Sequence, residues 1–143
     1  MPERLVRPSC EVSNVDLEVP QQIARNYTVS ILASAIRFTQ LTNARCAAVF
    51  SMDGTVKWCA RSTRFRKRIK RGKPIERSSV AHEYFSRGEL DDVPQGVPAD
   101  AWIETKGVDA EIVEHSICSP RHGSVLSMLW IPESVAAVLR MRD

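Results

Sequence analysis

The dipeptide Asp53-Gly54 separates two apolar stretches and constrains the fold of this chain more than any other feature. The stretches are residues 46–51 and 56–61. Asp-Gly adopts the positive φ angles that a type I′ turn requires, so the pattern predicts an antiparallel hairpin. The register that follows pairs Val49 with Trp58, Ala48 with Cys59 and Cys46 with Arg61.

A second hairpin is predicted near the end of the chain. Residues 111–118 and 124–131 both have strand-like composition, and a short linker that contains Pro120 and Gly123 joins them. Pro132 and Glu133 then open a last helix. The inward-facing residues expected on this helix are Val135, Val138 and Leu139.

A helix is expected over residues 31–41, with Ser30 as its N-cap. Its predicted buried stripe consists of Leu32, Ala35, Ile36 and Thr39. An earlier helix that begins at Pro20 and ends near residue 26 would complete a helix-turn-helix. The chain is therefore expected to be an α+β protein, with a lead-in and helix-turn-helix over residues 1–43 and an α+β domain over residues 44–143.

Between the hairpins, Phe65 and Ile69 are spaced to pin a short basic helix. Another helix is expected from a Ser78 or Ser79 cap to Gly88. An acidic Gly/Pro loop follows over residues 88–100, and a single helical turn follows it.

The charge of the chain is concentrated in one segment. Residues 61–73 hold eight basic residues and no acid, whereas the other 130 residues carry a net charge of −5. The segment fits a solvated or self-paired face, an acidic protein partner, or weak nucleic-acid binding. The candidate basic patch comprises Arg64, Arg66, Lys67, Arg68, Lys70 and Arg71.

The predicted helix-turn-helix makes DNA binding a candidate function. The second helix of such a motif enters the major groove, and Arg is its strongest base-contacting residue here. The alternative is a helix pair used only for packing or dimerisation. The candidate DNA contacts are Ser30, Ser34, Arg37 and Gln40.

Motifs for catalysis and for metal binding are incomplete. His82-Glu83 is followed by Ser86 where a zinc peptidase of the H-E-x-x-H type has its second histidine. His115, Cys118 and His122 lack a standard zinc spacing, and on a strand the first two would point to opposite faces. We expect no catalytic residue, no metal and no cofactor.

The remaining features favour a cytoplasmic protein that makes no membrane contact. The four cysteines form no C-x-x-C pair and are expected to be reduced and buried. No apolar run approaches the length of a membrane span, and the start of the chain has no secretory signal. Aromatic residues concentrate after residue 44, where they form either the core or a ligand pocket, with Trp58, Trp102 and Trp130 as candidates.

Residues 23–54 resemble a known family. They read A-R-x-x-x-V-S-x-x-x-x-x-I-R-F-x-Q-L-T and then C-A-A-V-F-S-x-D-G. This pattern resembles the part of ImmA/IrrE zinc metallopeptidases that follows the peptidase core, and residues 123–131 are similar to the last strand of that part. The resemblance implies a helix-turn-helix followed by a GAF-like antiparallel sheet flanked by helices.

The resemblance also bears on function. The zinc ligands and catalytic glutamate of that family lie upstream of the matching part, and no position here matches their motif. Met1-Pro2-Glu3 looks like the stretch that ends the peptidase core, so the chain is expected to be a piece of a longer peptidase or a remnant without its protease. The resemblance implies a non-catalytic regulatory or stress-response sensor module that binds a small ligand, a protein partner or a second copy. The alternative is a helix-turn-helix transcriptional regulator that binds DNA with residues 30–40 and the basic patch.

Overall fold

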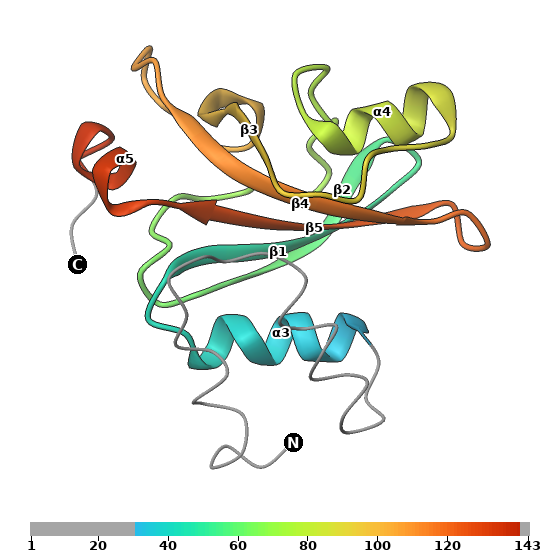
Figure 1. Ribbon diagram of the computed structural model, residues 1–143, viewed down its shortest axis with the longest axis horizontal. Coiled ribbons are helices and arrows are strands. Elements are labelled where there is room, and N and C mark those ends of the chain that lie inside the picture. Colours follow the sequence, from blue (N-terminus) through green and yellow to red (C-terminus); the bar gives the residue numbers. More distant parts are fainter. Residues whose placement is uncertain (1–30, 141–143) are drawn as a thin grey trace.

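The computed structural model describes residues 31–140, which form an α+β fold around one antiparallel sheet (Figure 1). The five strands lie in the order β2-β1-β5-β4-β3. The elements in chain order are α3 (Ile31–Leu41), β1 (Arg45–Met52), β2 (Thr55–Arg61), α4 (Val80–Arg87), β3 (Gln95–Pro98), the 3-10 turn η1 (Ala99–Ala101), β4 (Glu111–Ser119), β5 (Ser124–Ile131) and α5 (Glu133–Val138).

The two predicted hairpins are confirmed. Asp53 and Gly54 have φ angles of 53° and 74°, the sign that a type I′ turn requires at both positions. The predicted register is wrong by one residue, because Phe50, and not Val49, lies opposite Trp58. A β-bulge at the next position, which leaves Lys57 as the extra residue of β2, accounts for the shift. In the observed register, Arg61 pairs with Ala47.

Helix α3 covers one face of the sheet, and it buries Phe38 completely. The predicted stripe is rotated, because Ser34 and Phe38 are buried whereas Leu32 and Ile36 keep partial exposure. Phe38 offers the largest apolar surface on the helix, so turning it inward stabilises the packing most. The buried cluster on this face comprises Ala35, Phe38, Leu41, Cys46, Ala48, Leu126 and Met128. The predicted domain boundary after residue 43 falls between α3 and β1, which share this cluster.

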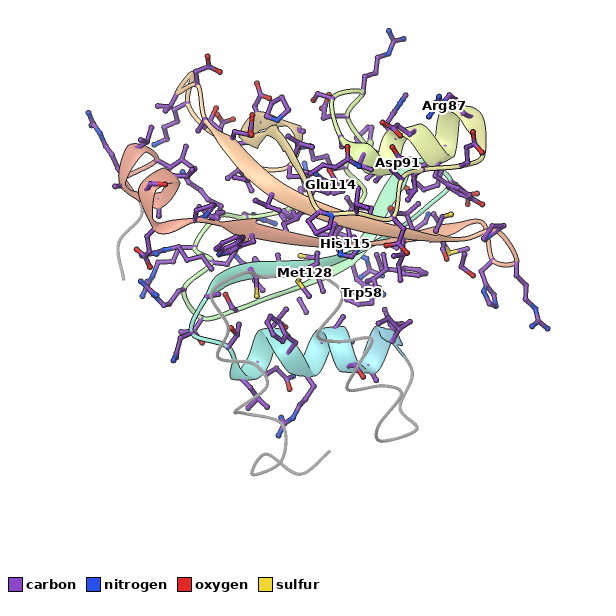
Figure 2. All side chains as sticks on the ribbon, in the orientation of Figure 1. Trp58, Arg87, Asp91, Glu114, His115 and Met128 are labelled. Atoms are coloured by element: carbon purple, nitrogen blue, oxygen red, sulfur yellow. The ribbon has the colours of Figure 1, made fainter. Side chains whose placement is uncertain are left out.

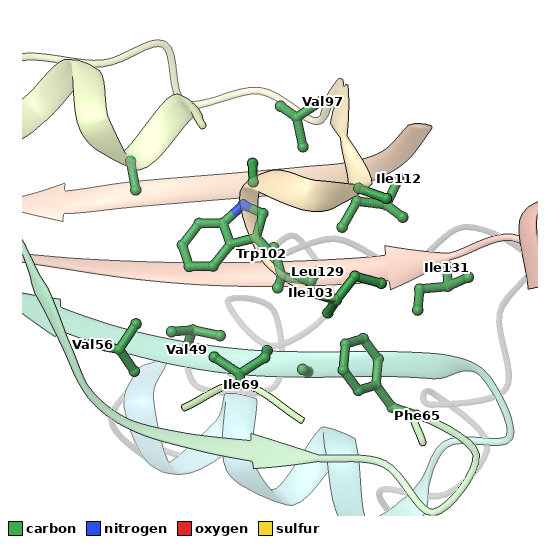
Figure 3. Close-up of a cluster of buried hydrophobic side chains, with 14 of the residues drawn as sticks. Val49, Val56, Phe65, Ile69, Val97, Trp102, Ile103, Ile112, Leu129 and Ile131 are labelled. Atoms are coloured by element: carbon green, nitrogen blue, oxygen red, sulfur yellow. The ribbon is translucent and has the colours of Figure 1, made fainter. Parts of the chain in front are cut away.

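The opposite face of the sheet carries the larger core (Figure 3). Helix α4, the segment after β2 and the turn η1 all pack there (Figure 1). The largest buried side chains of this core include Trp102, Phe65, Ile112 and Leu129. The sheet is therefore the middle of three layers, and its two faces offer separate environments.

Helix α4 forms as its capping residues predict. Ser79 accepts a hydrogen bond of 3.3 Å from the backbone N–H of His82, and Gly88 ends the helix with a φ of 82°.

The inward-facing residues predicted for the last helix are confirmed only in part, because Leu139, directly after α5, is buried but Val138 is 53% exposed. No helix within residues 31–140 has the length and apolar character that crossing a bilayer requires.

The predicted basic helix does not form. Residues 62–74 are irregular, although Phe65 and Ile69 are both buried as anchors. A helix would place Arg64 beside Arg68 and Lys67 beside Arg71, and like charges at that spacing are destabilising. The end of the segment instead follows the edge of β2, where the N–H of Val56 donates to the carbonyl of Lys73. The short edge strand β3, inside the predicted acidic loop, was not predicted.

Candidate functional site

An apolar cavity of about 460 Å³ lies between the start of α3 and one end of the sheet. Helix α3 contributes one wall through Ile31 and Leu32, and three strands contribute the others. The cavity opens on the α3 side of the sheet, away from the larger core. Its lining residues are Ile31, Leu32, Phe50, Met52, Ile117, Cys118, Ser119, His122, Ser124 and Leu126.

The β-bulge in the first hairpin shapes one wall of this cavity. Because the bulge places Trp58 opposite Phe50, the two rings stack with centroids 5.7 Å apart and planes inclined by 13°. An aromatic pair in this geometry is more favourable than its buried area alone suggests. Trp58 therefore holds the Phe50 ring in one orientation at the cavity, although it does not line the cavity itself.

One rim of the cavity is polar. It comes from the turn between β4 and β5, where His122 Nδ1 and the Ser119 hydroxyl are 2.9 Å apart. The His122 side chain is exposed, and its other ring nitrogen, Nε2, has no hydrogen-bond partner within the described part of the chain. An apolar cavity of a few hundred Å³ with a few polar groups at its edge is typical of a small-molecule site.

The three tryptophans predicted to form a pocket do not come together. Trp58 lies on the α3 side of the sheet, as Met128 does, whereas Glu114 lies on the α4 side (Figure 2). Trp130 also packs on the α3 side, against the buried cluster beneath the helix. Trp102 belongs to the larger core on the opposite face, where its indole binds Glu114. The prediction of a shared tryptophan pocket is therefore wrong.

Sequence reasoning missed the residues that line the cavity. The half-buried Ile31, Leu32 and Ile117 look like ordinary core positions in a helix or strand pattern. The available signal was that α3 carries more apolar residues than one narrow packing stripe needs. Which of them meet the sheet depends on the angle at which the helix packs, and this angle is a tertiary property.

The candidate DNA contacts on α3 differ in their exposure to solvent. Ser34 is fully buried, so its predicted role as an exposed contact is wrong. Arg37 is half-buried and donates a 3.1 Å hydrogen bond to the side-chain oxygen of Gln40, which is exposed. Ser30 and the predicted first helix lie outside the described residues.

One of the six residues of the predicted basic patch forms an ion pair in the described part of the chain. Arg64 donates a 2.9 Å hydrogen bond to Glu133, which also accepts one of 2.6 Å from the buried Arg45. The hydrogen bond from Arg45 is the main reason why the pKa of Glu133 lies below its usual value, and Arg64 lowers it further. The other members of the patch form no ion pair within residues 31–140; they are Arg66, Lys67, Arg68, Lys70 and Arg71.

A polar cavity of about 570 Å³ lies beside this patch, with Arg61, Arg66 and Cys59 among its lining residues. Burial raises the pKa of the Cys59 thiol, and the positive charge of Arg61 opposes this effect only in part. The thiol is therefore protonated near neutral pH, which is the unreactive form.

The histidines and cysteine with a possible zinc spacing lie apart. His115 points to the α3 side and is hydrogen-bonded to Asp92, whereas Cys118 packs against the opposite core. His122 is hydrogen-bonded to Ser119. In the described part of the chain, no three His, Cys, Asp or Glu side chains are grouped to hold a metal ion. These residues do not fit a zinc centre.

No family model matches the chain, and no curated protein is significantly similar to it in sequence.

Proposed function

We propose that this chain is a non-catalytic regulatory module that senses a small apolar ligand in the cavity beneath the start of α3. The cavity is the observation that carries the proposal. Its volume of about 460 Å³ falls within the range of ligand sites, and its walls are mostly apolar. The polar rim at His122 and Ser119 would orient a ligand that carries one polar or anionic group.

The resemblance to the regulatory part of ImmA/IrrE peptidases is in line with this function. A central antiparallel sheet flanked by helices is the arrangement expected of a GAF-like sensor. The proposal of a non-catalytic role rests on the sequence, because Ser86 occupies the position where the H-E-x-x-H motif needs its second histidine.

The mechanism follows from the two walls of the cavity. Ile31 and Leu32 belong to α3, whereas Phe50, Ile117 and Leu126 belong to the sheet. A ligand between them contacts both, so its affinity depends on where α3 sits. A ligand that binds one helix position more tightly shifts the population toward that position. Helix α3 would transmit this shift in population to residues 1–30, which precede it in the chain.

The proposal is tested with a fluorescent apolar anion, anilinonaphthalene sulfonate, titrated into the full chain. The double variant Leu32→Ser and Ile117→Ser makes two cavity walls polar. We expect its affinity for the probe to fall by about 5- to 30-fold, because roughly 1–2 kcal/mol of apolar contact is lost.

The matched control is the double variant Val93→Ser and Val138→Ser, which changes two exposed apolar residues that do not line the cavity. Thermal unfolding of both variants shows whether they remain folded at the temperature of the titration. Equal probe affinity in the two folded double variants would rule out the cavity as the binding site.

The alternative function, a helix-turn-helix regulator that reads DNA with residues 30–40, is not favoured by any described contact. Burial of Ser34 leaves Arg37 and Gln40 as its remaining contacts on α3, and these two side chains bind each other.

A further inference from the structure

The densest run of positive charge in the described chain is the basic ridge, defined as Arg66, Lys67, Arg68, Lys70 and Arg71. Four of the five side chains are exposed, and Lys67 is half-buried. Arg68 and Lys70 border a cavity whose lining also includes Glu76, Asp100 and Glu104, but neither cation lies within ion-pair distance of a carboxylate. The charge of the ridge is therefore available to an external anion.

The backbone of the ridge is held in place by buried side chains and by hydrogen bonds. Phe65 and Ile69 are only 2% and 5% exposed, so each anchors the segment in the larger core. The Arg61 guanidinium donates a 2.9 Å hydrogen bond to the carbonyl of Lys67. At the end of the ridge, the N–H of Gly72 donates to the carbonyl of Val56 at 2.7 Å. Binding to a fixed backbone loses less conformational entropy than binding to a free loop.

We propose that the basic ridge binds the phosphate backbone of double-stranded nucleic acid without reading its sequence. Three of its five cations are arginines, whose planar guanidinium groups match phosphate oxygens in pairs. Contacts to phosphates alone carry no sequence information. This activity is separate from ligand binding in the cavity beneath α3, because the two sites share no residue.

The composition of this segment argues against other anionic partners. The two apolar residues interspersed with the ridge, Phe65 and Ile69, are buried, so no apolar side chain is left to insert into a lipid surface or to anchor a protein interface. It also lacks an exposed aromatic ring on which an unpaired base could stack. Among the described residues, the large apolar side chains that are exposed are Val93, Val108 and Val138, all outside the ridge.

The test is fluorescence anisotropy with a labelled DNA duplex of mixed sequence and about 30 base pairs, measured over a series of salt concentrations. Each phosphate contact contributes about 0.9 to the slope of log affinity against log salt. The triple variant Arg66→Gln, Arg68→Gln and Arg71→Gln should lower the slope by about 2 to 3 and weaken binding at least tenfold at about 50 mM salt.

A matched control removes the same charge elsewhere through Arg87→Gln, Arg121→Gln and Arg140→Gln, all at exposed positions. It should keep the original slope and change the affinity by about twofold at most. Equal losses in the two triple variants would show that only net charge matters and would overturn the proposal. Tighter binding to phosphatidylserine vesicles or to polyglutamate than to the duplex would overturn it as well.

Discussion

The indole Nε1 of Trp102 donates a 2.8 Å hydrogen bond to the carboxylate of Glu114, and both side chains are buried. The same carboxylate accepts hydrogen bonds from the backbone N–H groups of Val80 and Ala81, at 3.0 and 2.8 Å. The Ser116 hydroxyl donates a further bond of 2.6 Å. One side chain of β4 therefore satisfies the first N–H groups of α4 and fixes the segment after η1.

Replacement of this carboxylate should destabilise the fold strongly. Glu114→Gln turns one acceptor into an N–H₂ donor that faces other donors, and it removes the negative charge at the start of α4. We expect the free energy of unfolding to fall by about 2–4 kcal/mol, as measured by urea denaturation. The tryptophan fluorescence of the folded chain should also change, because the Trp102 indole loses the carboxylate to which it donates. Glu111→Gln, at an exposed position on the same strand, is the control and should cost under about 0.5 kcal/mol.

The packing of α3 on the sheet predicts that two substitutions on this helix differ in their effect on stability. Phe38→Ala removes a fully buried ring from the smaller core and should lower the free energy of unfolding by about 3–5 kcal/mol. Gln40→Ala, at an exposed position two residues later, should change it by under about 0.5 kcal/mol. Hydrogen exchange of the α3 amides should speed up in the first variant only. Similar small effects of both changes would contradict the observed packing.

The contact of Glu133 with Arg45 and Arg64 predicts how stability depends on pH. Because the pKa of Glu133 is lower in the folded state, its contribution is present above the usual carboxyl pKa and is lost as the pH falls through the folded-state value. The melting temperature of Glu133→Gln should therefore lie below that of the unchanged chain near neutral pH. The gap should narrow on acidification.

A gap that stays constant between neutral and acidic pH would mean that the effect of Glu133→Gln does not come from its charge. Glu89→Gln serves as the control for this experiment. Glu89 is exposed, and its carboxylate forms no ion pair within residues 31–140, so no comparable gap is expected.

Local signals in the sequence predict much of this fold. The turn at Asp53-Gly54 and the caps of α4 at Ser79 and Gly88 lie where the residue types place them, because each depends on backbone angles within a few residues. The register of the first hairpin was missed because a bulge leaves no clear mark in the alternation of apolar residues.

Features that depend on tertiary packing could not be predicted from local sequence signals, and they include the buried glutamate and the candidate site. Glu114 and Glu111 lie on the same strand and look alike in the sequence, yet one is buried under α4 and the other is exposed. Strand alternation places them on opposite faces of the sheet, but only the packing of α4 buries the face on which Glu114 lies. The cavity is likewise a product of the packing between α3 and the sheet, so the tryptophans, which are conspicuous in the sequence, were the wrong candidates.

The most direct test of ligand binding beneath α3 is methyl NMR of the full chain with labelled isoleucine and leucine, recorded with and without anilinonaphthalene sulfonate. We expect shifts at Ile31, Leu32, Ile117 and Leu126, whose side chains line the cavity. The methyl groups of Ile69 and Ile112, in the core on the opposite face, should stay unchanged. Shifts centred on Ile69 and Ile112, or no shift at the cavity residues at saturating probe, would contradict the proposed site.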